Sequence, residues 1–199
     1  MSAPAFLGDY CKRGLIPWRN PISRRTGLHS HTGREGHATG QRRARADREC
    51  VSYLLQQIPG VQFLGAVDAP PEFDFDCGPG SQRERLRWLD IRARPLKETR
   101  ELGADTLVTV SHACQREWCD AADDTLSVRN YISLIADSLG CERTYESNAL
   151  AKLKQIGEPE SIVARTESNW SSHGLAKDEA AGIAHRYNWL QSAPRSDSP

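Results

Sequence analysis

A group of acidic residues and one arginine in the first half of the chain have the types and spacings of a metal site. Asp74 and Asp76 alternate with phenylalanines, which predicts a strand that carries both carboxylates on one face. Asp90 and Arg92 are also two residues apart, in an alternating segment that predicts a second strand. A turn rich in glycine and proline separates the two segments. We therefore expect antiparallel neighbours that bring these acids close to Glu49, which falls on the preceding predicted helix.

Carboxylates that converge on one point repel each other and are costly to remove from water, and a divalent cation offsets both effects. The candidate metal ligands are Glu49, Asp74, Asp76 and Asp90. Mg²⁺ suits such oxygen ligands and keeps several waters, and Mn²⁺ is the expected substitute. A metal-bound water can attack a phosphodiester while Arg92 holds the phosphate. The alternative is that the acids face solvent and that Arg92 forms only a cross-strand ion pair.

The order of these residues along the chain carries a family resemblance. Glu49 on a helix precedes Asp76 on a strand, and Asp90 and Arg92 follow on the next strand. This order resembles the PD-(D/E)xK, or restriction-endonuclease-like, nuclease superfamily over residues 42–110. The resemblance implies an α/β fold with a mixed sheet, flanking helices and a small helical C-terminal part. It also implies that these four residues are catalytic and that the protein is a magnesium-dependent DNA endonuclease.

The helical end of the chain adds a narrower likeness. The layout is similar to TnsA-type transposon endonucleases, which implies a role in transposition or mobile-element processing, with a protein partner in a larger complex. Two features depart from the superfamily pattern: no proline directly precedes the strand aspartate, and Arg92 stands where the superfamily has lysine. Arginine does not release its proton to act as a base. The alternative is therefore a non-catalytic DNA-binding or protein-interaction module on a degenerate nuclease fold.

Positive charge is concentrated near the N-terminus, although the net charge of the chain is zero. The sequence from Lys12 to Arg48 holds many arginines and few acids, whereas residues 68–76 and 117–124 are acidic. A basic arm beside an acidic centre can hold a polyanion next to a cation. The arginines expected to contact DNA are Arg24, Arg25, Arg42, Arg43 and Arg45. The alternative is that the arm is a solvated tail.

Hydrophobic spacing and turn residues divide the chain into elements. Strands are predicted at residues 61–64, 73–76, 87–92 and 106–110, and helices at 42–57, 127–139, 148–156 and 176–190, with a further segment that begins at Pro159. The helices that end at residues 139 and 156 are spaced as a loose helix-turn-helix. The predicted domains are a basic arm (1–40), a nuclease-like α/β core (41–125), a helical C-terminal part (126–191) and a tail (192–199).

Histidines and cysteines form two further candidate metal groups. The first is His29, His31 and His37, which suit a transition metal. The second is His112, Cys114 and Cys119, with Asp120 or Cys77 as a fourth zinc ligand. Neither group has the spacing of a standard zinc motif. The alternatives are a polar loop for the first group and small buried cysteines for the second.

The composition bounds the location of the protein. No apolar run approaches the roughly 18 residues that a membrane span needs. The first residues are too polar for a signal peptide, and the six cysteines have no disulfide-framework spacing. We therefore expect a cytoplasmic protein with reduced thiols and no membrane partner.

Overall fold

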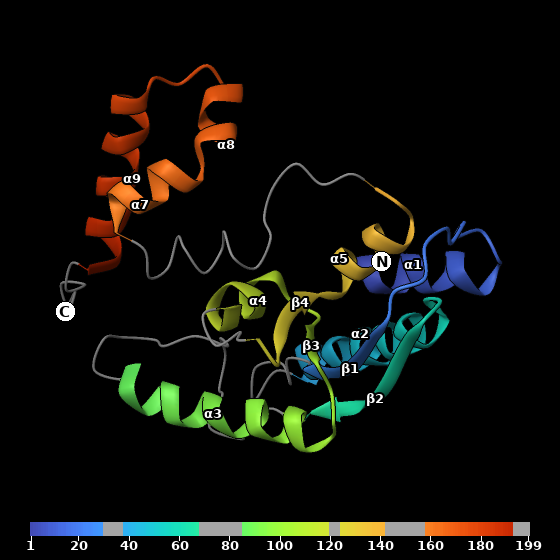
Figure 1. The fold of residues 1–199 in the computed structure, drawn as a ribbon. Helices are drawn as coiled ribbons and strands as arrows, with labels where there is room; N and C mark the ends of the chain where they lie inside the picture. The colour runs from blue at the N-terminus through green and yellow to red at the C-terminus, as the bar shows by residue number, and fades with distance from the viewer. Residues whose placement is uncertain (30–37, 68–84, 120–123, 142–157, 193–199) are drawn as a thin grey trace. The chain divides into compact units, whose positions relative to one another are not determined.

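The computed structural model describes residues 1–29, 38–67, 85–119, 124–141 and 158–192, and the chain divides into two compact units, Met1–Glu142 and Arg143–Pro199. The strands of the first unit are β1 (Arg24–His29), β2 (Val61–Val67), β3 (Thr106–Thr109) and β4 (Ser127–Asn130). Its helices are α1 (Ala3–Lys12), α2 (Ala38–Gln57), α3 (Arg85–Glu101), α4 (His112–Trp118) and α5 (Tyr131–Ser138) (Figure 1).

The strands form a four-stranded sheet in the order β2-β1-β3-β4, and each pair of neighbours is parallel. Parallel neighbours need crossover connections, and α2, α3 and α4 supply them between consecutive strands. The chain moves outwards from β1 to β2 and then crosses back past β1 to β3, so the first strand is central. The predicted α/β class with flanking helices is confirmed, and the described strands form a parallel rather than a mixed sheet.

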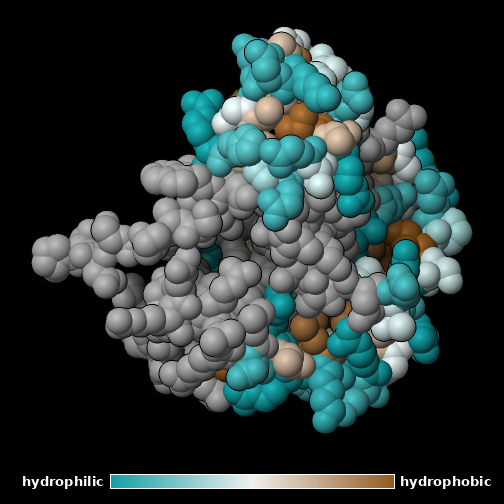
Figure 2. Space-filling view, turned by 60° about the vertical axis from the view of Figure 1, so that its left-hand side comes forward, coloured by the Kyte–Doolittle hydropathy of each residue, from teal (hydrophilic) through white to brown (hydrophobic). Residues whose placement is uncertain are grey.

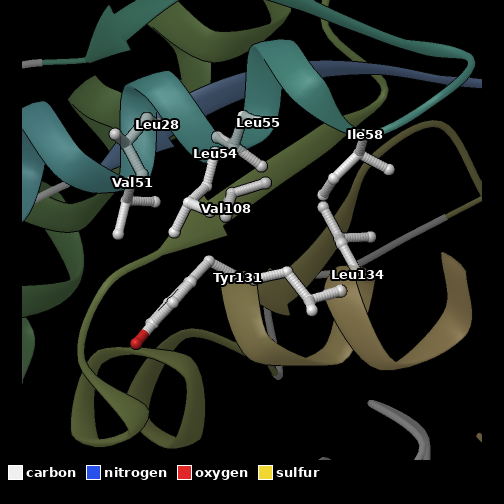
Figure 3. Close-up of a cluster of buried hydrophobic side chains, with 9 residues drawn as sticks. Leu28, Val51, Leu54, Leu55, Ile58, Val108, Tyr131 and Leu134 are labelled. Atoms are coloured by element: carbon white, nitrogen blue, oxygen red, sulfur yellow. The ribbon is translucent and has the colours of Figure 1, made fainter. Parts of the chain in front are cut away.

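The helices cover both faces of the sheet. Paired residues of parallel strands point to the same face, and Leu28 pairs with Val108. Both lie in a buried cluster with side chains of α2 and α5 (Figure 3). Leu107 pairs with Val128 in the alternate register, and both lie in a second cluster with side chains of α3 and α4. Therefore α2 and α5 cover one face, and α3 and α4 cover the other.

Helix α3 approaches the sheet closely over β1. A Cβ added at Gly27 of β1 would lie 3.3 Å from Thr99 Cγ2 of α3 and 3.4 Å from Val67 Cγ2 of β2. The absence of a side chain at Gly27 therefore admits the helix. Because α3 connects the end of β2 to the start of β3, it runs antiparallel to the strands. Its earlier residues consequently lie nearer the carboxyl ends of the strands than Thr99 does.

The N-terminal segment differs from the expected arm. Residues 3–12 form α1, which packs along α2, and residues 24–29 form the central strand β1. Ser2 caps α1, its side chain accepting a hydrogen bond from the Ala5 amide at 3.4 Å. The arm prediction is wrong for these residues because Leu28 is the one large aliphatic side chain of β1, which leaves little hydrophobic pattern to detect.

Residues 87–92, predicted as a strand, belong instead to helix α3. The buried residues of this helix are Ile91, Arg92, Pro95, Leu96 and Thr99. They recur at helical spacing, whereas the apolar residues before Pro95 alternate over too short a stretch to separate the two periods. Pro95 was expected to end a strand and lies inside the helix. The Thr99 hydroxyl donates to the Pro95 carbonyl oxygen at 2.6 Å.

The helix predicted from residue 127 begins four residues later, because residues 127–130 form β4. Asn130 marks the change, since its side-chain oxygen accepts a hydrogen bond from the Ile132 amide at 3.1 Å and caps α5.

Several predicted elements are confirmed. The helix at residues 42–57 lies within α2, and the strands at 61–64 and 106–110 correspond to β2 and β3. The elements predicted at residues 73–76 and 148–156 lie outside the described residues, and so does the second helix of the proposed helix-turn-helix.

The second unit is helical, with α7 (Pro159–Arg165), α8 (Glu167–Ser172) and α9 (Lys177–Ser192). Its small core is formed by Val163, Ala180 and Ala184, and the Trp170 indole donates to the Val163 carbonyl oxygen at 2.8 Å. The predicted helix at 176–190 is confirmed as α9. β4 and α5, which fall in the predicted helical part 126–191, belong to the first unit.

In the part of the chain that the structure describes, no helix combines the length and apolar character required to cross a membrane.

Candidate functional site

A row of side chains crosses the sheet at the carboxyl ends of its strands. The last residues of β2, β1, β3 and β4 pair in register, in the order Val67, His29, Thr109 and Asn130. Registered residues share a face, so all four side chains lie on the face that α3 and α4 cover. Each is buried, with His29 and Thr109 fully inaccessible to solvent. Three neighbouring polar side chains are therefore buried where the strands end.

The row lies at the position where open parallel sheets commonly bind ligands. The connection after β1 leads to α2 on one face, and the connection after β3 leads to α4 on the other. Because adjacent connections diverge there, a crevice forms at the carboxyl ends between β1 and β3. His29 and Thr109 are the paired residues on the two sides of this point.

Helix α4 holds the histidine in place. The rings of His29 and Trp118 stack with centroids 4.3 Å apart and an interplanar angle of 30°. Trp118 is fully buried in the cluster that joins α3 and α4 to the sheet. The imidazole is therefore fixed between the end of β1 and the end of α4.

The two other polar residues of the row differ in their hydrogen bonds. The side-chain amide of Asn130 donates to the Val110 carbonyl oxygen at 3.2 Å, so Asn130 is engaged both there and as the α5 cap. Thr109 Oγ1 is buried and has no hydrogen-bond partner among the residues that the structure describes. A buried hydroxyl without a partner loses about 1–3 kcal/mol relative to a satisfied one, so it marks a place for a ligand atom or a water.

The first half of α2 projects beyond this edge of the sheet. Residues from Val51 onwards pack over the strands. Asp47 lies beside Tyr131, the residue after β4: burial raises the pKa of Tyr131 to about 12, and the Asp47 carboxylate adds to the rise. The residues one turn earlier carry exposed arginines, namely Arg42, Arg43 and Arg45. Arg43 lies 4.0 Å from Asp47, and the other two extend the positive surface at the helix N-terminus.

No family model, curated protein or solved structure matches this chain.

The predicted nuclease residues are distributed over different parts of the fold. Glu49 is exposed on α2, and Asp90 is exposed on α3. The two helices cover opposite faces of the sheet, so the structure does not bring these acids together. Asp74 and Asp76 lie outside the described residues.

Asp90 and Arg92 do not share a face as the strand prediction required. Residues two apart on a helix differ by about 200° in direction. Accordingly Asp90 faces solvent, whereas Arg92 is 8 % exposed and faces the sheet.

The arginines of the predicted basic arm also separate. Arg24 and Arg25 begin β1 and so lie at the amino edge of the sheet, where the guanidinium of Arg25 is 3.7 Å from the Asp105 carboxylate. The arginines of α2 lie beyond the opposite edge. A continuous basic surface through both groups is therefore wrong.

The histidine and cysteine groups do not form a metal centre within the described ranges. No three histidine, cysteine or acidic side chains gather there to hold an ion. His112 is exposed on α4, whereas Cys114 and Cys119 are buried. The remaining members of the two groups, His31, His37, Cys77 and Asp120, lie outside the described residues.

Sequence reasoning singled out His29 but missed Thr109 and Asn130. The available signal was a polar residue at the carboxyl end of each of three strands. That signal has no meaning until β1 and β4 are recognised as strands, and both were assigned differently.

Proposed function

We propose that the protein binds a small polar ligand over the carboxyl ends of β1 and β3. The observation that carries this proposal is the buried row of His29, Thr109 and Asn130 at the point where the strand order reverses. Ligands of open α/β sheets bind outside the carboxyl ends of the strands at this point. Convergent polar groups within an apolar surrounding are also typical of a ligand site.

The hydroxyl of Thr109 gives a test that needs no identified ligand. Thr109→Val keeps the shape of the side chain and removes a buried group that has no described partner, so we expect the free protein to gain about 1 kcal/mol of stability. Urea unfolding followed by circular dichroism measures this gain. A protein that stabilises a binding site by removing its polar group is expected to lose binding at the same time.

Thr106→Val is the matched control at the other end of the same strand. Thr106 is also buried, but its hydroxyl is 2.8 Å from the Asp105 carboxylate and 3.0 Å from Ser127 Oγ. This variant should be less stable than wild type by about 1 kcal/mol. Adenosine, adenosine monophosphate and citrate serve as probes in thermal unfolding, with saturable stabilisation of wild type and none of Thr109→Val as the expected result. If Thr109→Val destabilises the protein as Thr106→Val does, the hydroxyl is structural and the proposal fails.

DNA-backbone binding is a second candidate, favoured by the exposed arginines of α2. Each phosphate that is neutralised on duplex DNA contributes about −0.9 to the slope of log affinity against log salt. Replacing Arg42, Arg43 and Arg45 together with glutamine should therefore make this slope shallower for unrelated duplexes. Arg24→Gln with Arg25→Gln is the control, because these arginines lie at the opposite edge. Equal slopes for wild type and the α2 variant would remove this candidate.

Metal-dependent cleavage of DNA on a restriction-endonuclease-like fold is a proposal that rests on residue order in the sequence. Within the described residues, Glu49 and Asp90 lie on opposite faces of the sheet, so the geometry favours binding over cleavage. Plasmid nicking that needs Mg²⁺ or Mn²⁺, stops with chelator and is lost in Asp90→Ala would restore the nuclease proposal.

A protein-interaction module is less well supported. Figure 2 shows hydrophobic residues on the displayed face as small separate patches among hydrophilic ones. Binding surfaces for stable protein partners usually form larger apolar patches.

A further inference from the structure

Arg92 lies over the row of buried polar side chains, on the face that the row occupies. Thr99 of α3 lies directly above Gly27, two residues before the end of β1. Arg92 precedes Thr99 by seven residues, which is two helical turns, or roughly 10.5 Å along the same helix face. Two residues of strand advance roughly 6.6 Å, so the Arg92 backbone lies slightly beyond the level of His29.

Independent packing agrees with this placement. Ile91 lies in the same buried cluster as Val67, the row's member on β2, and as Trp118, which stacks on His29. Arg92 follows Ile91 and is 8 % exposed. An arginine side chain is long enough to reach the strand ends from this position.

The charge of Arg92 restricts what can occupy the site. A guanidinium keeps its proton at all physiological pH values, and arginine is rarely buried without an anionic partner. Its planar fork matches the oxygens of phosphate and carboxylate groups. A hydroxyl such as that of Thr109 donates to the same oxygens. The opposite charge at this edge comes from Asp47 and from exposed Asp90, and the exposed arginines of α2 exceed it.

We infer that the ligand carries a phosphate group, held by the guanidinium of Arg92 and the hydroxyl of Thr109 at the carboxyl ends of β1 and β3. This inference rests on the proposed ligand-binding function and adds the chemical class of the ligand. The α2 N-terminus and its arginines favour the approach of such an anion.

Inorganic phosphate is the probe that tests the inference. The melting temperature of the full chain is measured against phosphate concentration, with chloride adjusted to keep ionic strength constant. We expect a saturable rise for wild type. Arg92→Met should weaken the apparent affinity about tenfold or more, because a charge-assisted bidentate contact is lost. Arg92→Lys should retain part of the affinity, since charge remains without the fork.

Arg94→Met is the matched control, because Arg94 is exposed on the same helix two residues away. It should bind phosphate as wild type does. Circular dichroism of Arg92→Met and Arg92→Lys establishes that both are folded. The inference is overturned if phosphate stabilises wild type no more than chloride does, or if Arg92→Met and Arg94→Met bind phosphate equally.

Failure of the inference can be distinguished from failure of the proposed function. If phosphate has no effect while adenosine stabilises wild type and Thr109→Val is more stable than wild type, the ligand is neutral and the site stands. If no probe stabilises wild type and Thr109→Val gains no stability, both the site and the inference fail.

Discussion

Trp118→Ala is expected to lower the stability of the first unit by about 3–5 kcal/mol. Trp118 is fully buried in the cluster that ties α3 and α4 to the sheet, and its ring stacks on His29. Replacing it removes the largest side chain of the described core and leaves a cavity that surrounding helices fill only in part. Because domains are stable by about 5–15 kcal/mol in total, this change removes a large fraction of the stability. Urea unfolding followed by far-ultraviolet circular dichroism measures the loss.

Two further variants separate packing from stacking and from the second unit. Trp118→Phe keeps an aromatic ring and should cost less than the alanine variant. Trp170→Ala changes the second unit, where Trp170 is partly buried, and should leave the unfolding transition of the first unit in place. A Trp118→Ala protein that loses less than about 1 kcal/mol would show that α4 does not pack as described.

Leu54→Ala should destabilise the other face of the sheet by about 2–5 kcal/mol. Leu54 of α2 is fully buried, and Figure 3 shows it beside Val108 of β3 in a cluster that also contains Tyr131 of α5. The loss follows from the removed hydrophobic contacts and from the remaining cavity. The melting temperature and the urea midpoint both report it.

Leu102→Ala is the matched control, because the same atoms are removed from a side chain that is 40 % exposed after the end of α3. Surface substitutions usually change stability by less than about 0.5 kcal/mol. Similar losses for the two leucine variants would contradict the packing of α2 against the sheet.

The elements that sequence reasoning located are those with a long, regular hydrophobic pattern. Helix α2 repeats its buried residues Val51, Leu54, Leu55 and Ile58 at helical spacing, and β3 is apolar on both faces. The central strand β1 escaped because a glycine, a threonine and a histidine take three of its four buried positions. Gly27 is required by the close approach of α3, which depends on contacts distant in sequence.

The candidate site depended on topology that one sequence does not contain. His29 and Thr109 are neighbours only because β1 lies between β2 and β3, an order that crossover connections establish. Arg92 was selected as a phosphate-binding residue from its spacing to Asp90. The spacing argument was wrong because the segment is helical, yet Arg92 is buried and Asp90 is not. The prediction of the residue therefore survives as a proposal with a different physical basis.

The central place of β1 also has a consequence for the growing chain on the ribosome. Thr26 of β1 pairs with Thr106 of β3, so 80 further residues must be translated before this side of β1 can be covered. At about 5–20 residues per second, synthesis leaves that strand edge open for roughly 4–16 s, plus the transit time through the exit tunnel. β2 can pair on the other side much earlier, because only α2 intervenes. The order of synthesis thus leaves a half-built sheet whose open edge is available to chaperones until β3 emerges.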